Sequence, residues 1–150
     1  MIGQILRPAV DSAVLLPGTG SDEVFVRSVF EGPLTEAGMR LVAPAPVPGP
    51  DVVEHHFASL DAAWTGEPIV VGGVSLGAHV AAAWAMRNPS RCAGLLLALP
   101  AWNGPAVGAP AAWSAAASAA AVSEKGLHGA LDGVAGWLRA ELLRAWGGHG

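Results

Sequence analysis

The sequence contains a single cysteine, Cys92, so it has no disulfide framework. Cys92 begins an apolar run, where a buried structural thiol is more common than a nucleophile. No apolar run approaches the ~18 residues of a membrane span. Arg7 and Asp11 also interrupt the apolar residues near the N-terminus. These absences predict a soluble, cytoplasmic protein with no membrane span.

Charge is also scarce, because 13% of the residues are charged and the formal net charge is −4. The eight lysines and arginines are scattered and form no basic patch, so we expect no nucleic-acid partner. The histidines and carboxylates lack the spacings of a zinc or calcium site. We therefore expect no bound metal and no other cofactor.

Apolar side chains, in contrast, are abundant. They make up 52% of the 150 residues, which argues against disorder and suffices for a domain with a sizeable core. Short β-branched or leucine-rich runs alternate with helical patterns over the first two thirds of the chain. This alternation predicts a three-layer α/β/α fold with a mostly parallel sheet. The expected strands are residues 13–16, 39–43, 68–71 and 93–99.

Helix signals separate these expected strands. Ser21 can cap a first helix, which Gly32-Pro33 should break, and Asp51 can cap a second helix. The second helix carries His56 in line with its apolar residues. At least one of His55 and His56 is expected on the solvated face of that helix.

The last third of the chain shows helical patterns and no strand. We therefore divide the chain into a core over residues 1–109 and a helical, lid-like segment over residues 110–150. Helices are expected over residues 111–122 and from Leu127 onward. Three tryptophans in this segment suggest a lid over an apolar acyl group: Trp113, Trp137 and Trp146.

The most informative motif is the pentapeptide Gly73-Val74-Ser75-Leu76-Gly77. It follows a β-branched run and precedes an alanine-rich helical pattern, which is the setting of a nucleophile elbow. The flanking glycines would remove collisions where strand and helix are pressed together. We expect Ser75 to be the nucleophile of a serine hydrolase, with the Leu76 amide holding the oxyanion at the helix N-terminus. The alternative interpretation is a glycine-rich turn with an inert serine.

Two further stretches extend the pattern: Leu-Leu-Pro-Gly-Thr-Gly at residues 15–20, and Glu-Ala-Gly-Met-Arg-Leu-Val-Ala-Pro at residues 36–44. With them, the chain resembles the α/β-hydrolase superfamily over residues 13–100. The resemblance implies that the Thr19 amide is the second oxyanion donor. It also implies a small-molecule acyl substrate, cleaved at an ester, thioester or related bond through an acyl-enzyme on Ser75. The implied strand order begins with residues 39–43, followed by the strands at Ala13, Ile69 and Ala93.

The same resemblance requires a carboxylate and then a histidine on later strands. No acid or histidine after Ser75 follows a recognisable strand. We interpret His79 as a packing or pocket-wall residue, and His149 as a candidate base in what is more often a frayed terminus. The chain therefore looks like the N-terminal half of a hydrolase and the start of its lid. The remaining acids and histidine after the elbow are Glu124, His128, Asp132 and Glu141.

Two other function classes stay open. Gly18-Thr19-Gly20 after a strand is compatible with a nucleotide-binding half-domain, although Glu23 stands where that fingerprint has its third glycine. The missing acid and histidine favour a non-catalytic or truncated hydrolase-like module that pairs with another chain. The apolar strand edge from Leu95 to Leu99 would support such pairing, including self-association.

Overall fold

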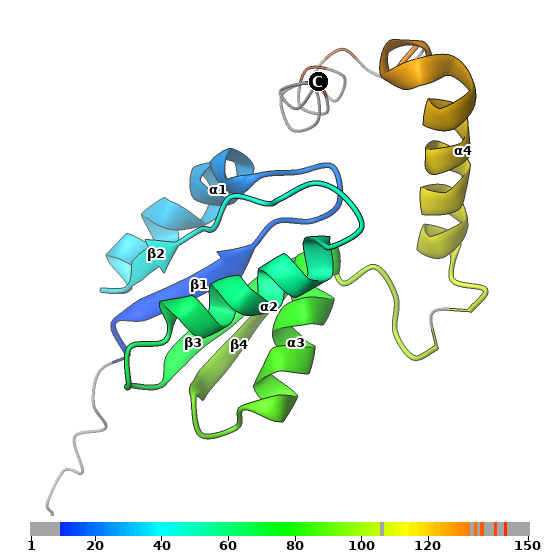
Figure 1. Cartoon of the computed structure of the whole chain (residues 1–150). Helices are drawn as coiled ribbons and strands as arrows, with labels where there is room; N and C mark the ends of the chain where they lie inside the picture. The colour runs from blue at the N-terminus through cyan, green and yellow to red at the C-terminus, as the bar shows by residue number, and fades with distance from the viewer. Residues whose placement is uncertain are drawn as a thin grey trace, which may run out of the picture.

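The computed structural model describes residues 10–105, 107–132, 134, 136, 140 and 143. Its centre is a four-stranded sheet in which each pair of neighbouring strands is parallel, in the order β2-β1-β3-β4 (Figure 1). The sequence-based strand order and the α/β class are therefore confirmed. The strands are β1 (Ser12–Leu16), β2 (Arg40–Val42), β3 (Ile69–Val74) and β4 (Cys92–Ala98).

Helices cover both faces of this sheet, as the alternation of residues along β1 shows. All of β1 is buried, and its side chains contribute alternately to two cores. Val14 and Leu16 lie in the core beneath two helices, while Ala13 and Leu15 lie in the core beneath a third. The fold has three layers, as predicted. The first two helices are α2 (Val52–Ala63) and α3 (Leu76–Arg87), and the helix on the opposite face is α1 (Glu23–Glu36).

Helix α1 runs unbroken through Gly32-Pro33, so the predicted break at this dipeptide is wrong. A proline inside a helix removes one hydrogen bond and strains the preceding turn. Buried Leu34 nevertheless holds the last turn against the sheet, and the Pro33 carbonyl accepts a hydrogen bond from the Ala37 amide at 3.1 Å. Tertiary packing therefore outweighs the local preference for a break.

The helix caps differ from the prediction at one position. Asp22, and not Ser21, caps α1, because the Asp22 carboxylate accepts a hydrogen bond from the Phe25 amide at 3.0 Å. Helix α2 does begin directly after Asp51, although the Asp51 side chain makes no capping hydrogen bond. Helix α2 therefore begins at the predicted position, and α1 begins one residue later than predicted.

The last helix, α4 (Pro110–Ala130), extends beyond the predicted range and has a non-helical residue at Gly126, where φ is 70°. None of the residues of α4 is buried, and Trp113 is 72% exposed. Figure 1 shows α4 standing apart from the sheet. The lid role of this segment therefore stays a prediction, and Trp137 and Trp146 lie outside the described residues. No helix in the described ranges is long and apolar enough to cross a membrane.

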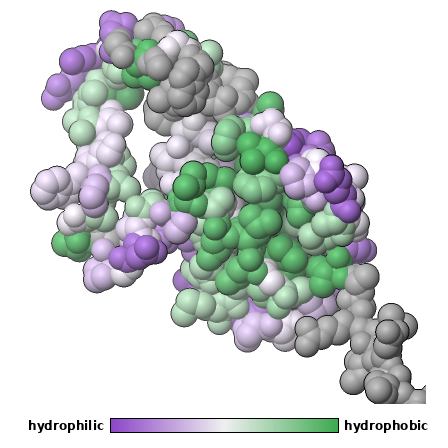
Figure 2. Space-filling model, turned by 180° about the vertical axis from the view of Figure 1, so that it is seen from behind, coloured by the Kyte–Doolittle hydropathy of each residue, from purple (hydrophilic) through white to green (hydrophobic). Residues whose placement is uncertain are grey.

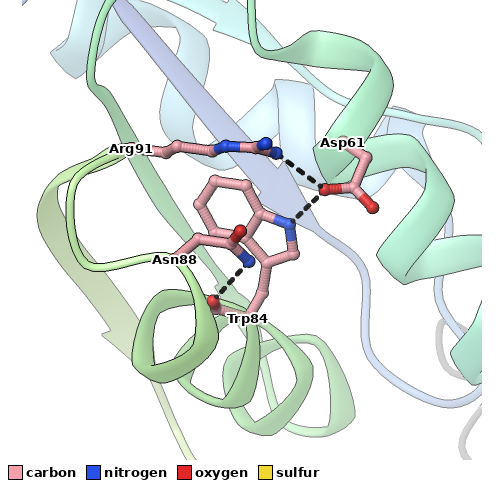
Figure 3. A network of polar contacts seen from close by, with 4 residues as sticks. All are labelled: Asp61, Trp84, Asn88 and Arg91. Atoms are coloured by element: carbon pink, nitrogen blue, oxygen red, sulfur yellow. Dashed lines mark hydrogen bonds and ion pairs between the residues drawn. The ribbon is translucent and has the colours of Figure 1, made fainter.

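A polar network around Trp84 connects α2, α3 and the start of β4 (Figure 3). The indole of Trp84, which is 1% exposed, donates a hydrogen bond to Asp61 Oδ1 at 3.0 Å. Arg91 Nη1 lies 3.5 Å from the same oxygen, and its guanidinium carbon lies 4.3 Å from the centre of the Trp64 ring. Asn88 Nδ2 donates to the Trp84 carbonyl at 2.9 Å. These contacts hold the two helices on one face of the sheet.

Strand β4 forms one edge of the sheet, and within the described ranges no strand pairs with its outer side. Leu95 and Leu97 on this strand are 49% and 42% exposed, and the following Leu99 is 81% exposed. Val70 and Leu96 are partly exposed on the face that carries α1. Figure 2 shows hydrophobic residues gathered on the molecule as seen from behind. The edge thus combines unpaired backbone groups with apolar side chains.

The Trp84 network predicts a specific stability change. Replacing Asp61 with Ala leaves the buried indole N–H without its acceptor, so we expect the free energy of unfolding to fall by about 1–3 kcal/mol. Asp61→Asn keeps an acceptor oxygen and should lose less. Glu31→Ala, which removes the exposed Arg27–Glu31 ion pair, serves as the control and should cost at most about 0.5 kcal/mol. Urea denaturation measures the free energy of unfolding of all three variants. Equal losses of this free energy in Asp61→Ala and Glu31→Ala would contradict the role of Asp61 as the acceptor for the Trp84 indole.

Candidate active site

Ser75 lies in the sharp turn between β3 and α3, with φ 52° and ψ −112°. A non-glycine residue in this region carries strain of about 1–3 kcal/mol and persists only where its surroundings hold it. Here the Ser75 amide donates to the Ala98 carbonyl at 3.0 Å, and the Ser75 carbonyl accepts from the Ala78 and His79 amides at 3.1 and 3.3 Å. The turn is therefore fixed from both sides.

The glycines that flank Ser75 have the steric role predicted from the motif. A Cβ on Gly73 would lie 2.5 Å from the Leu16 oxygen and 2.7 Å from the carbonyl carbon of Gly77. A Cβ on Gly77 would overlap the backbone oxygens of Leu16 and Pro17. Both obstacles are backbone atoms, which cannot move away as a flexible side chain can. The end of β1, the end of β3 and the start of α3 can thus meet only without these side chains.

The loop after β1 also touches the elbow. A Cβ on Gly18 would lie 3.1 Å from the Ser75 Cβ and 3.1 Å from the Val74 oxygen. Gly18 therefore lets the backbone of this loop approach the serine closely. The next residue is Thr19, so the two segments predicted to supply oxyanion donors are neighbours in space.

A pocket of about 310 Å³ opens beside the elbow. It lies at the carboxyl ends of β1, β2 and β3, which is where parallel α/β sheets bind ligands. Thr19 and Leu76, the two predicted oxyanion residues, both line it. No acceptor for either backbone amide is found in the described part of the chain. The other lining residues are Gly18, Gly20, Ser21, Pro46, Pro48, Gly49, Val52 and His56.

His56 is a pocket residue that sequence reasoning did not select. Its side chain is 2% exposed, whereas the neighbouring His55 is exposed, in agreement with the expectation for at least one of the pair. Burial, and secondarily the neighbouring His55, lowers the pKa of His56 below its ordinary value. The signal in the sequence was its position between Val52 and Leu60 at helical spacing, which placed an imidazole on the inner side of α2.

The imidazole of His56 makes no hydrogen bond to any described residue. Its ring nitrogens are not among the fully buried polar atoms that lack a partner in the described part of the chain, which are Ser21 Oγ, Trp64 Nε1 and His79 Nε2. By contrast, the buried indole of Trp84 on α3 has its acceptor in Asp61 on α2. The pocket beside His56 is the place from which a ligand could supply the missing partner.

Three histidines follow the elbow in the sequence, and two of them lie within the described residues. His79 stacks on Trp102 with ring centres 4.1 Å apart and an interplanar angle of 18°, which agrees with a packing or pocket-wall role. Its Nε2 is buried and lacks a hydrogen-bond partner among the described residues. His128 is exposed on α4, and His149 lies outside the described ranges. No described histidine side chain hydrogen-bonds to Ser75.

None of the acids after the elbow is assigned a catalytic role. Glu124 on α4 and Asp132 just after it are exposed, and Glu141 lies outside the described residues. Over the part of the chain that the structure describes, no group of three histidine, cysteine, aspartate or glutamate side chains could hold a metal ion. The described site therefore consists of the strained Ser75, the backbone amides of Thr19 and Leu76 that are predicted to be oxyanion donors, and a pocket, and no described side chain is assigned as a base.

Neither protein-family models nor curated proteins gave a match to this chain. The chemistry of the site therefore has to be inferred from the geometry of Ser75 and its pocket.

The steric role of Gly77 predicts a large and position-specific loss of stability. Gly77→Ala places a methyl group against two backbone carbonyls, so we expect the free energy of unfolding to fall by at least about 2 kcal/mol. Gly32→Ala is the matched control, because its new methyl group in α1 meets nothing within 4 Å apart from its chain neighbours and its own helix backbone. Its stability should change by less than about 1 kcal/mol, because the gain in helix propensity is opposed by contact of the new Cβ with the ring of Pro33. Chemical denaturation measures the free energy of unfolding of both variants. An unchanged free energy of unfolding in Gly77→Ala would contradict the close contact of Gly77 with the backbone of Leu16 and Pro17.

Proposed function

We propose that this chain is a serine hydrolase module that cleaves an ester, thioester or related acyl bond of a small molecule through an acyl-enzyme on Ser75. The observation that carries the proposal is the strained conformation of Ser75 at the junction of β3 and α3. Strain of this kind gathers at functional sites, where it presents a side chain for reaction. The pocket lined by Thr19 and Leu76 lies beside it.

In the proposed reaction, Ser75 Oγ forms a bond to the substrate carbonyl carbon while the hydroxyl proton passes to a base. The carbonyl π electrons move onto oxygen, and the Thr19 and Leu76 amides stabilise that oxyanion, helped by the N-terminus of α3. Collapse of the intermediate expels the alcohol or thiol, which takes up a proton. Water then attacks the acyl-enzyme, releases the acid and returns the proton to Ser75.

The base of this reaction is not assigned to a described residue. An oxyanion hole and substrate binding without a complete triad still accelerate acyl transfer by about 10³–10⁴-fold over water. We therefore expect slow turnover by this chain alone. Robust ester hydrolysis that disappears in His149→Ala would instead make His149 the general base.

Labelling of Ser75 tests the proposal. At alkaline pH, where hydroxide supplies the base, a fluorophosphonate should attach to Ser75 Oγ, with fluoride leaving the phosphorus and the hydroxyl proton passing to hydroxide. Mass spectrometry of the labelled protein should locate the adduct at Ser75, and Ser75→Ala should remove it. The control is Ser28→Ala, because Ser28 is an exposed serine whose hydroxyl donates to the Phe25 carbonyl. Labelling that survives in Ser75→Ala, or no labelling of the folded wild-type chain, would reject Ser75 as the nucleophile.

The edge of β4 favours a second candidate function, in which this chain pairs with another copy of itself. Leu95 and Leu97 flank unpaired backbone groups over the described part of the sheet. Natural sheets usually protect such an edge with charge, proline or a covering segment. Neither a charged residue nor a proline interrupts residues 92–98.

A substitution at the edge tests this pairing. We expect the wild-type chain to self-associate and Leu97→Lys to shift it toward the monomer, because the ammonium group would be desolvated in the paired edge. Met86→Lys is the control, since Met86 is 85% exposed on α3 and outside the sheet. Sedimentation velocity measures the association state, and circular dichroism checks the fold of each variant. A monomeric wild-type chain would contradict the pairing.

A further inference from the structure

The pocket beside Ser75 is lined by apolar residues together with a few polar ones. Proline, valine and leucine side chains form the apolar part, and the backbone of the loop after β1 passes along another part. Among the described lining residues, none carries a fixed charge, and His56 is the one with a titratable side chain. At about 310 Å³, the pocket is near the small end of the range for ligand sites.

His56 gives this pocket a chemical preference. The residue is 2% exposed and hydrogen-bonds to no described residue, although an imidazole offers two ring nitrogens for such bonds. No described residue of α2 or of the sheet forms a hydrogen bond with this imidazole. The pocket is therefore the side from which a hydrogen-bonding partner can reach this imidazole.

The geometry points to a specificity role: we propose that the pocket binds a compact acyl group and that His56 recognises a neutral hydroxyl or carbonyl substituent on it. The inference rests on the proposed hydrolase function, because Thr19 and Leu76 in the same wall would hold the reacting carbonyl oxygen. His56 is thus a substrate-recognition residue, distinct from the unassigned base.

The preference for a neutral substituent has two causes. Burial and the adjacent His55 lower the pKa of His56, so its imidazole is neutral near pH 7 and can donate one hydrogen bond and accept another. An acyl group with its own carboxylate would need a cation, and no lysine or arginine lines the described wall. A wholly apolar acyl group would enter the pocket but leave the imidazole unpaired.

Three matched esters test this inference on the full chain carrying Ser75→Ala, which prevents turnover. Ethyl 3-hydroxybutyrate carries the neutral hydroxyl, ethyl 3-methylbutyrate replaces that hydroxyl with a methyl group, and monoethyl succinate carries a carboxylate. Chemical shifts of the histidine ring signals report binding, with exposed His55 as the internal reference. We expect the hydroxy ester to bind about five- to tenfold more tightly than the methyl ester. The succinate ester should bind most weakly.

Two variants separate recognition from structure. His56→Leu should bring the affinity for the hydroxy ester down to that for the methyl ester while the affinity for the methyl ester stays unchanged. His56→Gln, which keeps a donor and an acceptor, should retain part of the preference. Binding by these variants is followed through backbone amide shifts, and their folding by circular dichroism. Equal binding of the two neutral esters to the Ser75→Ala chain would overturn the inference without any His56 variant.

The outcomes also separate this inference from the proposed function. If the preference for the hydroxy ester depends on His56 but Ser75 is not labelled by the fluorophosphonate, the recognition role of His56 stands and the hydrolase function is rejected. A labelled Ser75 with no preference between the hydroxy and methyl esters would keep the hydrolase and reject the recognition role of His56. Tighter binding of monoethyl succinate than of the hydroxy ester would also reject it.

Discussion

The contact of three backbone segments at the elbow is the constraint on which the rest of the site depends. The end of β1 presents the Leu16 oxygen to the positions where Gly73 and Gly77 would otherwise carry side chains. Because the obstacles are carbonyl groups of a buried strand, neither partner can relax away. This approach places α3 directly over the sheet, forces Ser75 to a positive φ, and brings the loop with Thr19 against the serine.

Polar groups buried on the same side of the sheet divide into two kinds. The indole of Trp84 is satisfied by Asp61, whose carboxylate also contacts Arg91, so this group fixes the packing of α2 against α3. The imidazole of His56, which precedes Asp61 on α2, has no hydrogen-bond partner among the described residues and lines the pocket. The satisfied indole stabilises one packing arrangement, whereas the imidazole at the pocket wall keeps hydrogen-bonding capacity that no described residue uses.

The errors of sequence reasoning have a common cause in tertiary packing. Gly32-Pro33 carries a strong local signal for a break, yet burial of Leu34 keeps the last turn of α1 in place. Ser21 and Asp22 are both good capping residues, and the path of the loop after β1 decided between them. Such decisions depend on contacts between residues distant in the sequence, which propensities and spacing do not contain.

The order of the strands, the three layers and the strand–turn–helix at Ser75 followed from the sequence, because hydrophobic period and glycine spacing are local properties of the chain. Only the tertiary structure decided which histidine of α2 faces a pocket, that Thr19 and Leu76 share its wall, and that no described histidine side chain hydrogen-bonds to Ser75. The physical reason is that a site is made where separate segments converge. Their relative positions are set by the packing of the sheet, and no single segment encodes that packing.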